Sequence, residues 1–230
     1  MEMQFFVPPG TELGYYEEWK QKRLNWHLAL GLGSENYKFH DHEKLAHYAN
    51  AAADIEFKFP FGFKELEGIH SRTDFDLSAH EKFSGRKLQY FDNERNENYT
   101  PFVVETSVGL DRLFLAIFST CLKDEVLEDG SERTVLTLPP ALAPVKAAIL
   151  PLMKKDGLGE YGEKIFNDLK YDFNVIYEDK DSIGKRYRRQ DAIGTPFCIT
   201  VDHDSLTDHT VTLRDRDTMK QERVPVSDLR

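Results

Sequence analysis

Hydrophobic residues recur with helical spacing in residues 110–121, directly after a β-branched and aromatic stretch at 101–105. The apolar positions of this helical pattern are Leu110, Leu113, Phe114, Ile117, Phe118 and Cys121. Because these positions share one face of a helix, the pattern predicts a buried strand, a turn at Gly109 and an amphipathic helix. The other predicted elements are placed around this unit.

Alternating polar and apolar residues predict strands in the first part of the chain. The expected strands cover residues 1–7, 53–59 and 63–70, with a turn at 60–62 that makes the last two a hairpin. A helix is expected from Glu12 to Leu30, and a shorter one over 74–83. These elements predict an α+β domain built on an antiparallel sheet.

After residue 133 the pattern changes to strands that alternate with helices. Strands are expected at 145–153, 173–179, 196–202, 209–217 and 222–226, and helices at 158–170 and 182–193. Alternation with short connections predicts an α/β domain with a mostly parallel mixed sheet. The charged segment 123–133 and the proline-rich segment after it indicate a hinge, so we expect domains at 1–132 and 133–230.

Charge divides unevenly between these two parts. Residues 1–132 carry 14 Lys and Arg against 24 Asp and Glu, whereas residues 133–230 carry 16 against 16. The second part is therefore the better place for a nucleic-acid surface. Cys121 and Cys198 each lie in an apolar run, which indicates buried free thiols. No signal peptide or membrane-spanning run is recognised, and we expect a soluble cytoplasmic protein.

The strand–turn–helix unit carries chemistry of its own. Glu105 and Ser107 end the strand, and Asp111 and Arg112 lie in the first turn of the helix. Free N–H groups at a helix start, together with an arginine, suit a phosphate, while Glu105 suits an ammonium group. The alternative is a structural corner whose charges are only solvated.

Two further groups of residues raise the possibility of ligand binding in the first part. Glu65 and Glu67 should share one face of a strand, which suits Mg²⁺–ATP or a substrate ammonium group but also an ordinary solvent face. His40, His42 and His47 could ligate a metal, but no Cys lies nearby and no HExxH pattern is present, so we expect no metal site.

Four cations surround Tyr187 on one short predicted helix. They are Lys185, Arg186, Arg188 and Arg189. A tyrosine among cations suits an unpaired base and its phosphates, although a solvated helix face is a real alternative. Phosphate-binding and dinucleotide-binding glycine motifs are absent, as is a GxSxG nucleophile elbow.

Three stretches of the sequence resemble a known family. ETSVGLDR, at 105–112, resembles motif 3 of class II aminoacyl-tRNA synthetases, whose arginine contacts ATP. ELEGIHSRTDFDLSAH, at 65–80, and SIGKRYRRQDAIGTPFCITVD, at 182–202, resemble the dimeric type of glycyl-tRNA synthetase. The similarity covers essentially the whole chain in the family's order.

This resemblance implies the later half of a class II catalytic domain followed by an anticodon-binding domain. It implies glycine–tRNA ligation with ATP and Mg²⁺, tRNA(Gly) and glycine as partners, a homodimer, and neither a membrane nor DNA. Arg112 and Glu105 would be the catalytic residues. The implied ATP site comprises Glu65, Leu66, Gly109, Leu110, Asp111 and Arg112. The implied glycine site comprises Glu2, Glu105, Thr106, Ser107, Val108 and Gly109. The implied tRNA surface comprises Lys185, Arg186, Tyr187, Arg188 and Arg189.

The chain departs from the family at one point. Motif 1 and the arginine of motif 2, which holds the α-phosphate, have no counterpart here. We therefore expect either a fragment of a longer enzyme or a split product. Because adenylation needs cations on the phosphates, we expect the chain to be inactive by itself. The alternative is a non-catalytic class II synthetase-like protein that binds RNA or a partner.

Overall fold

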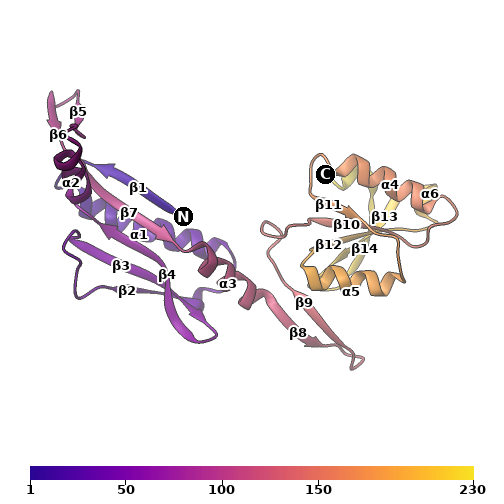
Figure 1. Ribbon diagram of the computed structural model, residues 1–230. Helices are drawn as coiled ribbons and strands as arrows, with labels where there is room; N and C mark the ends of the chain where they lie inside the picture. The colour runs from indigo at the N-terminus through magenta and orange to yellow at the C-terminus, as the bar shows by residue number, and fades with distance from the viewer. The chain divides into compact units, whose positions relative to one another are not determined.

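The computed structural model describes residues 1–230, which divide into two compact units, Met1–Ser119 and Thr120–Arg230 (Figure 1). The domain boundary expected at residues 132 and 133 lies within strand β9 (Glu132–Leu136). It stays a prediction about which part of the chain folds independently.

The first unit is built on a five-stranded antiparallel sheet with the strand order β1-β7-β4-β3-β2. Its strands are β1 (Glu2–Val7), β2 (Tyr37–Asp41), β3 (Ala51–Phe59), β4 (Gly62–Ser71) and β7 (Phe102–Val108). Its helices are α1 (Glu12–Ala29), the 3₁₀ turn η1 (Ser34–Asn36), α2 (Phe75–Ser84) and α3 (Leu110–Cys121). The predicted antiparallel sheet and the α3 helix are confirmed.

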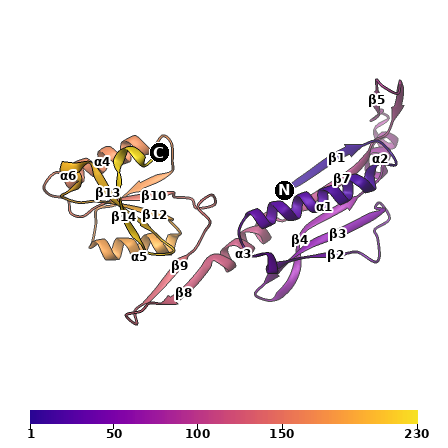
Figure 2. The same cartoon turned by 180° about the vertical axis from the view of Figure 1, so that it is seen from behind.

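Helix α1 covers one face of this sheet (Figure 2). Phe5 of β1 packs its ring against Trp19 of α1, with the ring centroids 5.6 Å apart. Ile69 and Val104, on the central strands, are fully buried. Since side chains alternate across a strand, the neighbouring residues of the same strands point to the opposite face, which no helix of this unit covers.

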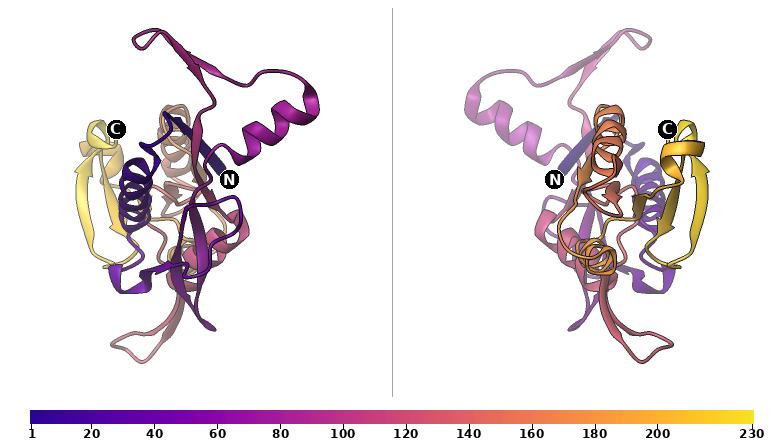
Figure 3. Two further views of the ribbon diagram at one scale, coloured as in Figure 1. Left: turned by 90° about the vertical axis from the view of Figure 1, so that its left-hand side faces the viewer. Right: turned by 90° about the vertical axis from the view of Figure 1, so that its right-hand side faces the viewer.

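An arm leaves the sheet after β4. It consists of α2 and a separate two-stranded hairpin of β5 (Tyr90–Asp92) and β6 (Glu97–Tyr99). Figure 3 shows α2 and this hairpin standing away from the five-stranded sheet. No residue of α2 is buried, so the arm adds little to the core.

The second unit contains a mixed five-stranded sheet with the order β11-β10-β12-β13-β14. Its strands are β10 (Ala147–Pro151), β11 (Val175–Tyr177), β12 (Phe197–Val201), β13 (Thr210–Asp215) and β14 (Gln221–Pro225). Its helices are α4 (Leu158–Leu169), α5 (Ile183–Ile193), α6 (Ser205–Asp208) and the 3₁₀ turn η2 (Val226–Asp228). The expected mixed sheet is confirmed, with β10 parallel to β11 and β12, and the remaining pairings antiparallel.

Strand β10 supplies both faces of the core of the second unit. Ile149 packs with Leu158 and Ile165 of α4, while Ala148 and Leu150 belong to the cluster on the α5 side. This alternation explains why the strand reads as a continuous apolar run, because a helix covers each face.

The segment predicted to be a hinge is instead a β-hairpin of β8 (Leu122–Val126) and β9. Cross-strand partners hold it: Arg133 pairs with Glu125 at 2.7 Å, and Thr134 donates a hydrogen bond to Asp124 at 2.6 Å. Opposite charges facing each other across two strands stabilise the pairing. The charges that suggested a flexible segment are therefore the side chains that order it.

Both cysteines are free and buried, as predicted. Burial raises the pKa of the Cys198 thiol to about 12, so this group is not a nucleophile near neutral pH. No helix combines the length and the apolar character that crossing a bilayer requires.

Candidate functional site

Glu105 lies in the middle of the sheet face that α1 leaves uncovered. Its strand neighbours in register are Gln4 of β1 and His70 of β4. The Gln4 amide donates to Glu105 Oε2 at 3.2 Å, and Arg72 Nη1 donates to Oε1 at 3.2 Å. Glu105 is only 7% exposed, and these bonds fix its carboxylate on the polar face of the sheet.

Histidines flank this carboxylate on the β4 side. His70 Nδ1 lies 4.0 Å from Glu105 Oε1 and has no hydrogen-bond partner. Burial lowers the pKa of His70 below its usual range, although the Glu105 and Asp54 carboxylates oppose this shift. A neutral His70 leaves Glu105 with its charge only partly compensated, which suits an added cationic group. Next to it, His42 Nε2 and Asp54 Oδ2 are 2.8 Å apart.

The other residues expected at a glycine site divide between the two faces of the sheet. Glu2 pairs in register with Ser107, and Gly68 lies opposite Ser107 on the other side, so these positions share the face of Glu105. Thr106 and Val108 are each 4% exposed and point to the α1 face. Only the backbone of these two residues is available to a ligand beside Glu105.

Arg112 and Glu65 meet at the corner between β4 and α3. Arg112 Nη1 donates to the Glu65 carbonyl oxygen at 2.6 Å and lies 3.2 Å from Glu65 Oε2. Both side chains are about half exposed, so this arginine can turn toward a ligand. The corner borders a cavity of about 340 Å³ lined by Phe59, Phe61, Lys64, Glu65, Arg112 and Leu115.

The rest of the expected ATP-binding stretch surrounds this corner. Leu66 is buried, and its carbonyl oxygen accepts a hydrogen bond from Gly109 N at 3.4 Å. Leu110 and Asp111 follow in the exposed first turn of α3. The fold thus brings the two sequence stretches 65–66 and 109–112 together.

Glu67 does not line this corner. Its carboxylate is fully buried under α1, where Arg23 donates two hydrogen bonds, at 2.6 and 3.1 Å, and His27 Nε2 lies 2.7 Å away. Burial raises the pKa of Glu67, but the bonds from His27 and Arg23 outweigh it and hold the pKa below the usual range. The charge of Glu67 is thus balanced by Arg23 of α1, and this carboxylate needs no ligand cation.

In the second unit, a groove of about 740 Å³ runs beside α5. It is lined by Gly184, Lys185, Tyr187, Arg188, Arg189, Ala192, Arg214, Met219 and Gln221. Four of these residues are cationic, and none is acidic. Arg189 nevertheless pairs with Glu178 and with Asp181, the latter at 2.9 Å, so part of its charge is compensated.

Tyr187 lies in the wall of this groove. Its hydroxyl is 2.6 Å from Thr200 Oγ1, and the Arg214 guanidinium lies over its ring at 4.7 Å from the centroid. The ring is therefore fixed on one side by a cation–π contact, which limits the base stacking that the sequence suggested.

Arg186, expected to contact tRNA, is instead only 1% exposed. Its guanidinium donates to the carbonyl oxygens of Pro151 and Glu178, at 2.8 and 2.9 Å, and to that of Leu152. These acceptors lie at the carboxyl ends of β10 and β11. Arg186 is thus a structural residue that no phosphate can reach, and it is not part of the RNA-binding surface that the sequence suggested.

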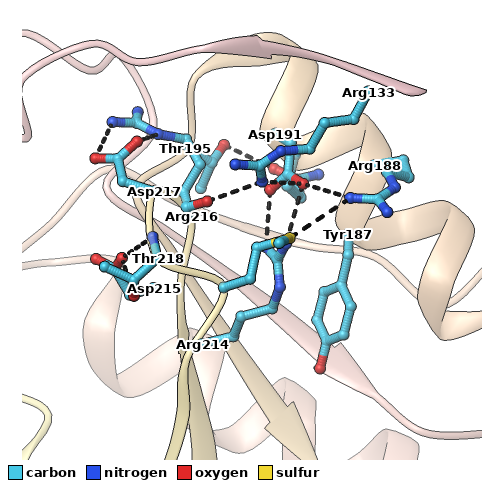
Figure 4. Close-up of polar contacts among 12 residues, drawn as sticks. Arg133, Tyr187, Arg188, Asp191, Thr195, Arg214, Asp215, Arg216, Asp217 and Thr218 are labelled. Carbon is cyan, nitrogen blue, oxygen red and sulfur yellow. Dashed lines mark hydrogen bonds and ion pairs between the residues drawn. The ribbon is translucent and has the colours of Figure 1, made fainter. Parts of the chain in front are cut away.

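A fully buried carboxylate, Asp191, contacts two of the arginines that line the groove (Figure 4). Arg214 donates two hydrogen bonds to it, at 2.7 and 3.0 Å, and Arg133 of the β8–β9 hairpin donates one at 3.2 Å. Arg188 lies 3.5 Å away. One negative charge is thus shared by three arginines, two of which line the groove, so the local charge stays positive.

The three histidines considered as metal ligands do not converge. His40 contacts Glu56, His42 contacts Asp54, and His47 packs its ring against Phe75. No group of three or more His, Cys, Asp or Glu side chains could hold a metal ion.

Sequence reasoning missed Gln4, His70 and Arg72 as neighbours of Glu105. A signal was present, because residues two apart on antiparallel strands share a face and β1 and β4 both carry polar residues at such positions. Only the pairing register of β1, β4 and β7 shows that these positions meet.

Comparison with known proteins gives consistent matches. Residues 146–230 match the family model of the anticodon binding domain. Over 228 residues the chain is 55% identical to the glycine–tRNA ligase of Chlorobaculum tepidum, with 99% of this chain and 48% of that protein covered. It is 53% identical to that of Borrelia hermsii and 52% identical to that of Geobacillus thermodenitrificans, with the whole chain and 53% and 49% of those proteins covered. The chain spans about half the length of the relatives it matches.

Proposed function

We propose that this chain forms the part of a glycine–tRNA ligase that binds glycine, ATP and the anticodon. The premise is that the chain belongs with these ligases, because it is similar to them along its whole length. The whole enzyme would activate glycine as an adenylate and transfer it to the 3′ end of tRNA(Gly) in the cytoplasm. The observation that carries this proposal is the polar face around Glu105, next to the Arg112 corner.

The proposed partner of the glycine ammonium group is Glu105. Its carboxylate is held by Gln4 and Arg72, and its strand neighbour His70 is uncharged at neutral pH, so a small cation gains a charge-assisted hydrogen bond there. Glu2 and Ser107 would complete the pocket on the same face. Such a crowded, carboxylate-lined pocket excludes a larger amino acid, because a side chain on its Cα would meet these groups.

The cavity at the α3 corner suits ATP. Phe59 and Phe61 stack with an interplanar angle of 5°, and Phe61 is 64% exposed, so a flat aromatic surface is available for a base. Arg112 and Lys64 supply cations for phosphates, and Glu65 supplies one exposed carboxylate. Mg²⁺ usually binds one or two carboxylates together with substrate phosphates, so this donor set fits a metal that arrives with the nucleotide and offsets its charge.

The basic groove beside α5 is the proposed tRNA surface of the second unit. Lys185, Arg188 and Arg214 line it, and Asp191 holds the last two in place. Cations around a groove attract the phosphate backbone whatever the base sequence. The groove lies within the residues that match the anticodon binding domain, except for the Arg133 contact from the hairpin.

The alternative function, a class II-like protein that binds RNA without activating glycine, predicts RNA binding with no adenylate chemistry. Glycine-dependent exchange of pyrophosphate into ATP separates the two, measured in a full-length ligase that contains this chain. Arg112→Ala should lower the exchange rate about 100-fold, as the loss of one transition-state donor does, and leave tRNA affinity unchanged. An exchange rate equal to that of the wild type would show that Arg112 does not act on ATP.

A further inference from the structure

The arm of the first unit carries an exposed segment whose chemistry the proposed sites do not use. Residues 82–91, KFSGRKLQYF, contain three cations and three aromatic residues and no acidic residue. Every residue of this segment is exposed, and Phe83 reaches 84% exposure. The three aromatic rings of the segment are therefore all exposed. Exposed apolar patches generally mark an interaction site.

Hydrogen bonds and a ring contact hold the two ends of the segment. Helix α2 ends at Gly85 in the left-handed conformation, with φ of 68°, and Gly85 N donates to the Glu81 carbonyl oxygen. Leu88 N donates to the Glu81 carboxylate at 2.8 Å, which folds the chain back toward β5. Tyr90 then pairs with Tyr99 across the hairpin, with the ring centroids 5.7 Å apart. The aromatic and cationic side chains are thus displayed on a defined backbone.

The cations of the segment have no acidic partners. Ion pairs in the hairpin involve Arg95 with Asp92 and Glu97, and not Lys82, Arg86 or Lys87. Lys82 only approaches the Phe83 ring, at 5.7 Å from its centroid. Uncompensated cations between exposed rings match single-stranded RNA, whose phosphates need charge and whose unpaired bases need flat surfaces.

The base of the arm is linked directly to the Glu105 pocket. Arg72 Nε donates to Asp76 of α2 at 2.7 Å, while its Nη1 donates to Glu105 at 3.2 Å. One guanidinium group therefore joins the first turn of the arm's helix to the carboxylate proposed to bind glycine. The base of the arm therefore lies beside the Glu105 carboxylate.

We propose that residues 82–91 bind the single-stranded 3′ end of tRNA and guide it toward Glu105. This inference rests on the proposed function, since that reaction brings such an end to the pocket. It adds a second RNA-binding surface, on the first unit, that is independent of the groove beside α5. Phe83, Tyr90 and Phe91 would stack on bases, and Lys82, Arg86 and Lys87 would contact phosphates.

The test measures the binding of the 230-residue chain to intact tRNA(Gly), to the same tRNA without its single-stranded 3′ terminus, and to a short unstructured RNA. Two arm variants are used, Lys82→Gln with Arg86→Gln and Lys87→Gln, and Phe83→Ala with Tyr90→Ala and Phe91→Ala. The matched control, Lys22→Gln with Lys44→Gln and Lys58→Gln, removes the same charge from exposed positions outside the arm.

Both arm variants should weaken binding to intact tRNA and to the short RNA about tenfold or more, and the truncated tRNA should bind wild type and variants alike. The cationic variant should also lower the slope of log affinity against log salt by about 2, as three lost phosphate contacts on a single strand predict. Photo-crosslinking of a 3′-terminal thiouridine to residues 82–91 of the wild type tests the same contact without any substitution.

Several results would overturn the inference. These are a control variant that weakens binding as much as the arm variants, crosslinks that avoid residues 82–91, or arm variants that bind RNA normally but change the sedimentation of the chain. The last result would mean that the arm contacts a second copy. If Lys185→Gln with Arg188→Gln abolishes tRNA binding while the arm variants do not change it, the proposed function stands and this inference fails. If the arm variants weaken binding to intact tRNA and to the short RNA while Lys185→Gln with Arg188→Gln does not change tRNA binding, this inference stands and the proposed role of the groove fails.

Discussion

Replacing Asp191 by Asn should destabilise the second unit more than any other single polar change in it. The side chain is fully buried and is the shared partner of Arg133, Arg188 and Arg214. Asparagine keeps the size of the side chain and one acceptor oxygen, but it removes the negative charge. Arg133 and Arg214, whose side chains are 2% and 4% exposed, would then be buried cations without a full counter-charge.

The expected loss follows from the cost of breaking a buried ion pair. Removing one partner of such a pair usually costs about 3–5 kcal/mol, because the charge left behind stays desolvated. At about 4 °C for each kcal/mol in a unit of this size, the melting temperature should fall by about 12 °C or more. The assay is thermal unfolding followed by far-ultraviolet circular dichroism.

Two controls make this experiment specific. Asp181 also pairs with an arginine, Arg189, but both side chains are nearly half exposed, so Asp181→Asn should leave the melting temperature almost unchanged. Both tryptophans of the chain, Trp19 and Trp26, lie in α1 of the first unit, so their fluorescence transition should not move. A fall of less than about 4 °C for Asp191→Asn would refute the view that the arginines depend on this carboxylate.

Three further predictions concern both units. Glu105→Gln should raise the KM for glycine about 10- to 100-fold in a full-length ligase with little change in that for ATP, because a charge-assisted hydrogen bond contributes about 1.5–3 kcal/mol; a shift confined to ATP would contradict the assignment. The pKa of Glu67 is lowered in the folded state, so its carboxylate stabilises the folded first unit above the ordinary Glu pKa of about 4.3. This stabilisation is lost as the pH falls through the folded pKa. Tryptophan fluorescence should therefore report an acid unfolding transition that Glu67→Gln diminishes. A piece comprising residues 120–230 should unfold cooperatively on heating, whereas 138–230, which lacks Arg133, should melt at a lower temperature; equal melting temperatures would show that the hairpin adds no stability.

The regular elements could be predicted because their side chains repeat with a simple period. The helix α3 and the alternating strands β3 and β4 are visible in the sequence, and the structure confirms these elements. The predicted apolar face of α3 is only partly buried, because Leu110, Phe114 and Phe118 are exposed. The β8–β9 hairpin was missed because its exposed strands carry charges rather than apolar residues. Its order comes from cross-strand pairs such as Arg133 with Glu125, which depend on a register that no periodicity reveals.

The candidate sites show the same division. Spacing predicted that Glu105 ends the strand and that Arg112 lies in the first turn of the helix. Arg112 does lie in the first turn of α3, but β7 continues to Val108, so Glu105 lies in the middle of the strand. Spacing predicted the same RNA-binding role for Arg186 as for its neighbours on α5. In the structure its guanidinium instead donates hydrogen bonds to carbonyl oxygens at the ends of two strands. A cation's partners in a folded chain come from distant segments, so the charge pattern alone cannot separate a structural arginine from one that is free to bind RNA.

The contact of Arg133 with Asp191 sets the limits of the piece that could be exchanged between related enzymes. A chimera joined at the start of the matched region, residue 146, would keep Asp191, Arg188 and Arg214 but take the arginine of the hairpin from another protein. Unless that protein supplies an equivalent cation, the buried carboxylate loses one of its three partners, and the groove arginines shift with it. The portable module therefore starts before β8, and a graft of this domain should carry the hairpin along.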